Sequence, residues 1–339
     1  MISITLANSG ITTSRLGFGC VSLTMHSDRA AAQRVLAAAY DSGIRHFDVA
    51  RLYGFGQCEG ILGSFLGDKP RDQITIATKF GLEPTGAASK SRKLMSIARW
   101  VVRRSNFLLK LARRSTQGAV AAGKFTPDDA KRMLETSMRE LQTDYIDLYL
   151  LHEAERSEAN NEDLVAFLQA QVARGTIRAF GPAGEYHKLG NDAALLNPAH
   201  TLVQFGSSTL EPNIRHLANT AGRDLVTFAP ISAVKLLADT AKSRPELQRQ
   251  WQGELGCSPT DTSALAGLFL ADALASNPSG IVLFASTHAE RITKNIDASL
   301  QPYPAARSAS FTRLVRELRQ LAAPVASDAG PKAASGRRQ

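Results

Sequence analysis

Four residues whose side chains can together deliver a proton follow short apolar stretches of the chain. Asp48 ends one stretch, Tyr53 comes five residues later, Lys79 ends a second stretch, and His152 ends a third. Hydride transfer to a carbonyl carbon leaves an alkoxide, which needs a proton as it forms. A phenol, with an ordinary pKa near ~10, is a weak acid at neutral pH, and a neighbouring ammonium lowers that pKa. We therefore expect Tyr53 to be the general acid and Lys79 to lower its pKa.

The other two residues complete the predicted proton-delivery set. A buried ammonium at Lys79 needs a counter-charge, which Asp48 can supply. The imidazole of His152 can form a hydrogen bond with the carbonyl oxygen and fix its approach. Each residue also has an ordinary structural explanation, as a turn-forming aspartate, a core tyrosine or a satisfied polar histidine. Their joint placement at the ends of successive apolar stretches favours the catalytic interpretation.

The apolar stretches are predicted strands that alternate with helices along most of the chain. The strands are short and rich in β-branched residues, as expected when both faces of a sheet are buried. They cover residues 15–20, 45–49, 73–79, 145–151, 176–181, 201–205, 225–230 and 280–285. The predicted helices cover residues 28–40, 59–66, 126–141, 162–173, 211–221, 258–276 and 290–299. Strict alternation favours parallel strands, and eight such units favour an α/β fold of the closed (β/α)₈ TIM-barrel type.

An open, doubly wound sheet is the alternative architecture for this pattern. No GxGxxG motif follows the first predicted strand, which weighs against a dinucleotide-binding fold of that kind. In a TIM barrel the carboxyl ends of the strands face the active site, so Asp48, Lys79 and His152 should converge there with Tyr53. Residues 2–13 contain the turn Asn8-Ser9-Gly10 and are expected to form an N-terminal β-hairpin.

We expect one barrel domain over residues 1–323, interrupted by a basic insertion at about 84–125 and followed by a disordered tail at 324–339. The insertion follows the third strand and carries ten basic and no acidic residues, whereas the whole chain has a net charge of +9. The rest of the chain is therefore close to neutral. The tail consists mostly of small and basic residues, a composition that does not support a core.

The insertion is expected to be helical, because apolar residues recur through it at helical spacing. As it follows the carboxyl end of a strand, the favoured interpretation is a substrate lid whose positive charge suits an anionic substrate. A helix that contacts a membrane surface or an acidic partner is the less favoured alternative. Nucleic acid is not an expected partner, since the sequence contains no recognisable nucleic-acid-binding module.

Composition limits the compartment and excludes several classes of protein. The 339 residues are 44% hydrophobic, yet no run of about 18 apolar residues exists that could span a membrane. The first ten residues lack the pattern of a signal peptide. The three cysteines lie far apart without metal-ligand spacing, so we expect reduced thiols in a cytoplasmic protein and no metal site.

From about Arg15 to Ser299 the chain resembles the aldo/keto reductase superfamily. The resemblance rests on RLGFG at 15–19, FDVARLYG at 47–54, EGILG at 59–63, IATK at 76–79, LQTDYIDLYLLH at 141–152 and GTIR at 175–178. It places the catalytic tetrad of the family on Asp48, Tyr53, Lys79 and His152. It also implies a monomer-like (β/α)₈ barrel that binds NADPH across its C-terminal mouth without a Rossmann motif.

The resemblance also assigns cofactor contacts, several of which depart from the family pattern. Ala183 and Gly184 stand where the family has a Ser-Asn pair that holds the nicotinamide amide, and Ala285 replaces a lysine. The matching positions are the amide ligand Gln204, the aromatic Phe228 in place of the family's stacking tyrosine, and Ser286, Arg291 and Asn295 after the eighth strand. Arg291 can pair with a 2′-phosphate, so the expected cofactor is NADP, with NAD as the alternative.

Together these features predict an NADP-dependent oxidoreductase, of the alcohol dehydrogenase or carbonyl reductase type. It would reduce an aldehyde or ketone to an alcohol, or catalyse the reverse reaction. The alternative is an aldo/keto-reductase-like protein that senses cofactor or binds a partner with weak or no turnover. The missing Ser-Asn pair and the basic insertion motivate that alternative, whereas the complete tetrad favours the enzyme.

Overall fold

The computed structural model describes residues 2–26, 28–84, 123–189, 195–217, 222–302 and 305–322. Nearly all of the predicted basic insertion and the whole predicted C-terminal tail lie outside these ranges. The extension of one domain over residues 1–323 stays a prediction, whereas the architecture of the described residues tests the predicted fold class directly.

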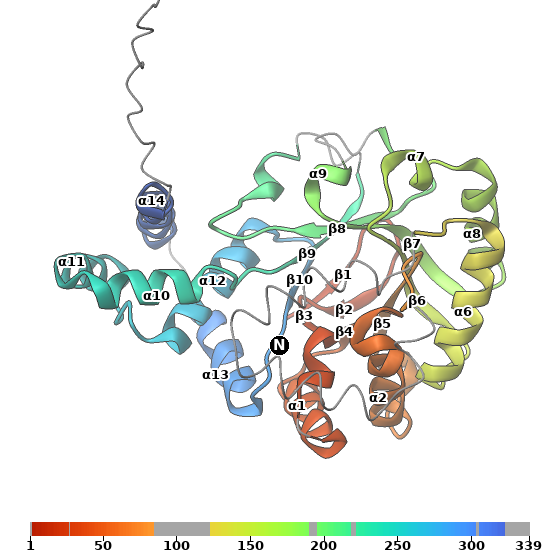
Figure 1. Cartoon of the computed structure of the whole chain (residues 1–339), viewed down its shortest axis with the longest axis horizontal. Coiled ribbons are helices and arrows are strands. Elements are labelled where there is room, and N and C mark those ends of the chain that lie inside the picture. Colours follow the sequence, from red (N-terminus) through yellow and green to blue (C-terminus); the bar gives the residue numbers. More distant parts are fainter. Residues whose placement is uncertain are drawn as a thin grey trace, which may run out of the picture.

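Eight parallel strands form a closed barrel, which confirms the predicted fold (Figure 1). They are β3 (Leu16–Gly19), β4 (His46–Asp48), β5 (Thr75–Phe80), β6 (Ile146–His152), β7 (Ile177–Gly184), β8 (Leu202–Gly206), β9 (Asp224–Phe228) and β10 (Ile281–Phe284). Each predicted strand overlaps one of these. β10 pairs with both β9 and β3, so the sheet has no free edge.

Helices cover the barrel, and four of them begin at a capping side chain. They include α1 (Arg29–Asp41), α2 (Gln57–Leu66), α6 (Pro127–Leu141), α8 (Glu162–Ala173), α12 (Thr262–Ser276) and α13 (Ala289–Ser299). The side chains of Asp28, Thr126, Asn161 and Asp261 accept backbone N–H groups at the starts of α1, α6, α8 and α12. The buried faces of these helices pack against the barrel strands and form one large apolar cluster with them.

The segment predicted as a helix at 211–221 differs in the structure. Its described part contains only the short 3₁₀ turn η6 (Asn213–Arg215), and residues 218–221 lie outside the described ranges. The side chain of Asn213 donates to the carbonyl of Gly206, and the hydroxyl of Ser207 accepts the N–H of Ile214. These local hydrogen bonds compete with those of a regular helix and tie the segment to the end of β8.

Five helices were not predicted from the sequence pattern. Two are the single turns α7 (Arg156–Ala159) and α9 (Tyr186–Leu189), and the others are α10 (Val234–Ser243), α11 (Pro245–Leu255) and α14 (Ala305–Ala322). The last three lie together beside the barrel with α12 (Figure 1). They share a second apolar cluster in which Trp251 and Phe311 are fully buried. No helix among the described residues has the length and apolar character needed to cross a membrane.

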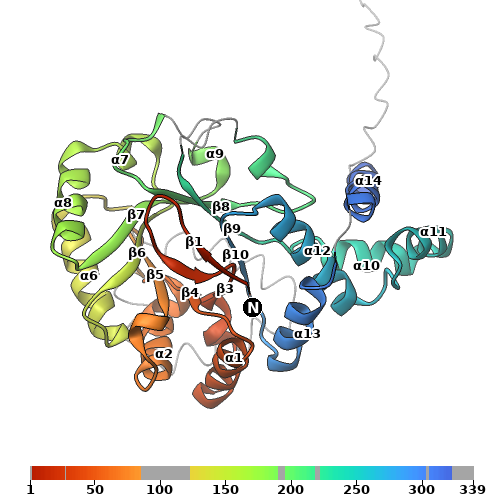
Figure 2. The ribbon, with the colours of Figure 1, turned by 180° about the vertical axis from the view of Figure 1, so that it is seen from behind.

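The predicted N-terminal hairpin is present and lies across one end of the barrel (Figure 2). Its antiparallel strands are β1 (Ser3–Thr5) and β2 (Thr12–Ser14). Leu6 and Ile11, which connect them, are fully buried among the inward-facing residues of the barrel strands. Asp224 at the start of β9 accepts hydrogen bonds from Asn8 and Ser9. The hairpin therefore closes the amino-terminal end of the barrel and leaves the carboxyl ends of the strands for the site.

Candidate active site

A cavity of about 410 Å³ lies at the carboxyl ends of the barrel strands. Six of the nine predicted site residues line it: Asp48, Tyr53, Lys79, His152, Gln204 and Phe228. Parallel pairing of β4 with β5 and of β5 with β6 brings the ends of these strands side by side. The barrel thus brings together the four residues of the predicted tetrad, which are separated by up to about a hundred positions in the sequence.

The ion pair between Lys79 and Asp48 lies at the bottom of this cavity. Lys79 Nζ is 2.6 Å from Asp48 Oδ1 and donates to the carbonyl of Val49 at 3.1 Å. Both side chains are buried, at about 3% exposure for each residue. Burial acts to lower the pKa of Lys79, but the carboxylate of Asp48 and the hydroxyl of Tyr53 outweigh it and raise that pKa. Lys79 is therefore an ammonium at neutral pH, as predicted.

Tyr53 lies between this ammonium and His152. Lys79 Nζ is 5.2 Å from the centre of the Tyr53 ring, and the His152 ring meets that ring edge to face at 5.8 Å. Burial raises the pKa of Tyr53, and Lys79 offsets only part of that rise, so the net shift is upward. Lys79 acts in the predicted direction, but the expected net lowering is wrong for this structure because desolvation of the phenolate is the larger effect.

His152 is neutral in this environment. Burial, followed by the charges of Lys79 and Lys188, lowers the pKa of His152 to about 3. Its Nδ1 is buried and has no hydrogen-bond partner among the described residues. A neutral imidazole has one N–H donor and one acceptor, so it can donate to a carbonyl oxygen without bringing a second positive charge next to Lys79.

The side-chain amide of Gln204, the predicted amide ligand, has one hydrogen-bonded atom and one atom without a partner among the described residues. Its Nε2 donates to Asp48 Oδ2 at 2.8 Å, which links it to the ion pair. Its Oε1 is buried and has no partner within the described part of the chain. Phe228 presents its ring to the same cavity, and Ala183 and Gly184 form part of the wall. An acceptor without a partner facing an apolar wall suits a planar amide-bearing ring.

The three other predicted cofactor residues lie beyond the cavity, after β10. Ser286 Oγ accepts the N–H of His288, so it caps the loop that leads into α13. Arg291 is exposed in the first turn of α13. Asn295 is only 5% exposed, and its Oδ1 is buried without a partner among the residues described. A guanidinium at a helix start can bind an anion, but Ser286, Arg291 and Asn295 do not line the central cavity.

Several residues that line the cavity were not predicted from the sequence. Val21 in the 3₁₀ segment η1 (Cys20–Met25) and Ile231 after β9 provide apolar wall. Glu153 and Glu185 provide two carboxylates near the end of β7. Glu153 could have been suspected, because it directly follows His152 at the end of a strand. The loop residues carry no sequence signal of their own, since their contribution depends on how the loops fold.

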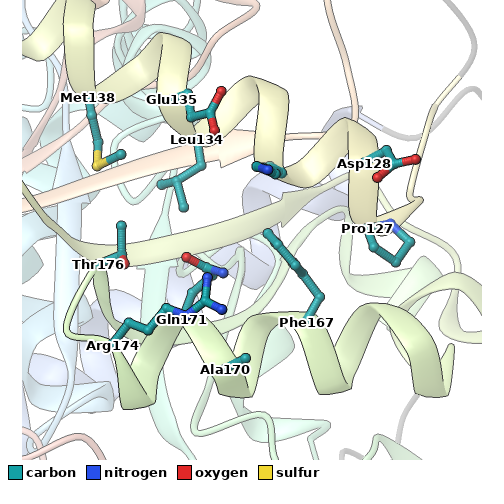
Figure 3. Close-up of a pocket in the computed structure, with 11 residues that line it drawn as sticks. Pro127, Asp128, Leu134, Glu135, Met138, Phe167, Ala170, Gln171, Arg174 and Thr176 are labelled. Carbon is teal, nitrogen blue, oxygen red and sulfur yellow. The ribbon is translucent and has the colours of Figure 1, made fainter.

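A second hollow, of about 380 Å³, lies on the outside of the barrel between α6 and α8 (Figure 3). Leu134, Met138 and Phe167 form its apolar floor, and Asp128 and Arg174 lie on its rim. None of the predicted site residues lines it. We therefore assign the chemistry to the cavity at the carboxyl ends of the strands.

The comparisons with known proteins agree with this geometry. The model of the aldo/keto reductase family matches residues 15–315. A probable aldo-keto reductase 1 of Glycine max is 28% identical over 236 residues, which cover 67% of this chain and 59% of that protein. A D-threo-aldose 1-dehydrogenase of Pseudomonas sp. is 30% identical over 194 residues, covering 52% and 51% of the two chains. The chain spans about half the length of the curated relatives it matches.

The solved structure of the aldo-keto reductase AKR11C1 from Bacillus halodurans, in its holo form, has a similar fold. Its TM-score is 0.65 at 21% sequence identity, and the match covers 94% of this chain and 96% of that chain. At this identity the likeness concerns the fold alone. It agrees with the closed barrel of eight parallel strands described above.

Proposed function

We propose that the chain, which belongs to the aldo/keto reductase family, is an oxidoreductase that interconverts an aldehyde or ketone with an alcohol, using NADP. Tyr53 would act as the general acid in reduction and the general base in oxidation. The observation that carries this proposal is the buried Lys79–Asp48 pair, which lines one cavity together with Tyr53 and His152. Such an arrangement holds a proton donor and a hydrogen-bond donor over one reacting atom.

A bound nicotinamide cofactor would supply the hydride, and the protein residues would control the proton. In reduction, the neutral His152 donates a hydrogen bond to the carbonyl oxygen and orients it. Tyr53 then gives its proton to that oxygen as negative charge develops there. An alkoxide is a stronger base than a phenolate, so this transfer is downhill even with the raised pKa of Tyr53. Lys79 stabilises the phenolate that remains, and Asp48 keeps Lys79 charged.

Two acceptors without partners support the fit of the residues to a nicotinamide cofactor. Gln204, whose Oε1 is buried, lines the cavity together with Phe228, and Asn295 Oδ1 is buried in the middle of α13. An amide N–H₂ group and an adenine amino group are donors of the kind that such oxygens accept. Arg291 supports NADP over NAD, since a guanidinium pairs well with a 2′-phosphate. Ser286 would bind the same phosphate region.

NAD stays the alternative cofactor. Similar proteins include one whose name carries NADP(+), the aldo-keto reductase yakc of Schizosaccharomyces pombe, and an NADH-specific methylglyoxal reductase of Escherichia coli. Ala285 removes a cation from the phosphate region, which weakens the preference that Arg291 provides. The dissociation constants of NADPH and NADH for the wild-type protein and for Arg291→Leu decide between them. Arg291→Leu should weaken NADPH binding by about 10- to 100-fold and leave NADH binding nearly unchanged.

The proposed activity is tested by following NADPH consumption with a panel of aldehydes and ketones. The panel should include anionic substrates, because the predicted basic insertion would attract them. Turnover of at least one carbonyl at a rate well above the protein-free background is the expected result. NADPH binding without turnover of any carbonyl or alcohol would contradict the proposal.

That contrary result would favour a second candidate, a cofactor-sensing or partner-binding protein with weak or no turnover. Ala183 and Gly184 favour this candidate, because neither has a side chain that can hold the nicotinamide amide. A loosely held nicotinamide would not place its hydride next to Tyr53. The two candidates therefore differ in whether another residue of the cavity takes over the amide contact.

A further inference from the structure

Glu153 has an unusual backbone conformation at the edge of the cavity. It directly follows His152 and has φ +60°, in the left-handed region that non-glycine residues seldom adopt. Its N–H donates to the carbonyl of Ala183 at 2.7 Å, which joins the end of β6 to the end of β7. This conformation costs energy and is kept only where the surrounding structure imposes it. Its effect is to turn the Glu153 side chain toward Gly184.

The carboxylate of Glu153 occupies the space that a side chain at position 184 would need. A Cβ added to Gly184 would lie 3.0 Å from Glu153 Oε2 and 3.1 Å from Glu153 Cα. The second distance involves backbone, so the neighbour cannot simply swing away. Gly184 and Glu153 are therefore complementary, because the missing side chain at one position makes room for the carboxylate from the other.

The surrounding residues hold this carboxylate in place. The N–H of Glu185 donates to Glu153 Oε2 at 3.3 Å, and Lys188 Nζ lies 3.5 Å from the same oxygen. Lys188 Nζ also donates to the backbone carbonyl of Glu153 at 3.2 Å. Within the described residues these contacts use Oε2 and leave Oε1 without a hydrogen bond. The side chain is 26% exposed and lines the cavity together with Ala183, Gly184 and Gln204.

We propose that Glu153 binds the carboxamide of the nicotinamide ring and replaces the side chains that Ala183 and Gly184 lack. This inference rests on the proposed function, since it concerns the same cavity and the same cofactor. A carboxamide N–H₂ group has two donors. Gln204 Oε1, on β8, can accept one, and Glu153, directly after β6, can accept the other. A charged carboxylate forms a stronger hydrogen bond than the neutral side-chain oxygen of the asparagine in the family's Ser-Asn pair.

The proposal predicts how the protein distinguishes cofactors that differ only at the carboxamide. In the 3-acetylpyridine analogue of NADP a methyl ketone replaces the amide, so both N–H donors are lost. The wild-type protein should bind this analogue more weakly than NADP, with dissociation constants measured by titration of protein fluorescence. In Glu153→Ala, the ratio of the analogue's dissociation constant to that of NADP should fall roughly tenfold, because the variant lacks the carboxylate that accepts the N–H group. Glu153→Gln, which keeps an acceptor oxygen, should retain much of the ratio.

Glu155→Gln is the matched control. Glu155 also lies near Lys188, at 3.5 Å from Nζ, but it does not line the cavity. In Glu155→Gln the ratio of the two dissociation constants should equal that of the wild-type protein. Thermal unfolding of all variants would exclude loss of folding as the cause of any change. An unchanged ratio in a folded Glu153→Ala would overturn the inference, as would an effect confined to the KM of the carbonyl substrate. Neither result would touch the proposed function, whereas a wild-type protein that binds no NADP or NAD would overturn both.

Discussion

At the scale of single residues, the site depends on the balance between burial and charge around Tyr53. Burial raises the pKa of Tyr53, and the Lys79 ammonium offsets part of that rise. Asp48 in turn keeps Lys79 charged although both side chains are buried. The identities and roles of these four residues could be proposed from their positions at predicted strand ends. The net direction of the Tyr53 shift could not, because desolvation depends on how completely the folded chain covers the hydroxyl.

Replacing Lys79 should separate its catalytic effect from its structural effect. Lys79→Met removes the charge that stabilises the phenolate, so kcat/KM should fall by about 10²–10⁴. The same change leaves the Asp48 carboxylate buried without its partner, so the free energy of unfolding should fall by about 3–5 kcal/mol. Adding Asp48→Asn removes the unpaired charge. The double variant should regain most of the lost stability in urea unfolding but none of the lost activity, and regained activity would contradict the role of Lys79.

The pH dependence of reduction should lack the inflection that a titrating histidine gives. Reduction needs protonated Tyr53, whose pKa is raised above its ordinary value near ~10, so activity should be lost only as the pH rises past that value. His152, with a pKa of about 3, stays neutral throughout the physiological range. The logarithm of kcat/KM should therefore be flat from pH 5 to 9, to within about twofold. An inflection near ~6.5 that disappears in His152→Ala would contradict a neutral His152.

At the scale of elements, the alternation of apolar strands and capped helices was sufficient to predict the barrel. Every predicted strand exists, and Asp28, Thr126 and Asn161 cap the helices that follow them. The segment at 211–221 was harder to predict, because polar side chains near its start bond to the end of β8 rather than to a helix. The backbone conformation of Glu153 could not be predicted, since a left-handed conformation at a non-glycine residue leaves no pattern in the sequence.

The close contact between α2 and α6 makes a specific prediction for two glycines of α2. A Cβ on Gly63 would lie 2.4 Å from the backbone oxygen of Glu140, so one of the helices must shift. Gly63→Ala should lower the free energy of unfolding by about 1–3 kcal/mol. Gly60 is the matched control on the same helix, because its added Cβ would meet only the end of the Glu140 side chain, at 3.1 Å.

Gly60→Ala should be neutral or slightly stabilising, since alanine favours a helix by up to about 1 kcal/mol relative to glycine. Chemical unfolding curves of the two variants provide the comparison. Equal effects of the two substitutions would show that helix propensity, rather than the contact with α6, governs both positions.

At the scale of the whole molecule, buried neutral histidines should make the fold sensitive to acid. Burial lowers the pKa values of His46 and His200 to about 4 each, and that of His152 to about 3. The unfolded chain takes up these protons near pH ~6.5, whereas the folded chain does not until the pH is far lower. The stabilising contribution is therefore complete above pH ~6.5 and is lost as the pH falls toward the folded pKa values.

His46 offers a direct test, because neither of its ring nitrogens has a hydrogen-bond partner among the described residues. Between pH 7 and 5 each of these histidines should cost about 2 kcal/mol of stability. His46→Leu should remove one such contribution and flatten the dependence of the unfolding free energy on pH. The measurement is urea unfolding at several pH values, and a variant with the same slope as the wild-type protein would contradict the assignment.

The barrel as a whole explains why these separate features serve one site. The hairpin of β1 and β2 closes the amino-terminal end, and Asp48, Lys79 and His152 lie at the carboxyl ends of β4, β5 and β6, at the opposite end. The helices α10, α11 and α14 pack around their own apolar cluster beside the barrel. They were not predicted, because they lie outside the strand–helix alternation that identified the barrel.

Substitution of Tyr53 tests whether its hydroxyl delivers the proton. Tyr53→Phe keeps the ring that packs against His152 and removes only the hydroxyl. With a carbonyl substrate that the wild-type protein reduces, we expect NADPH binding within about threefold of wild type and a loss of about 10²–10⁴ in the rate of NADPH oxidation in a single turnover. Full turnover by Tyr53→Phe, with unchanged NADPH binding, would show that Tyr53 is not the proton donor.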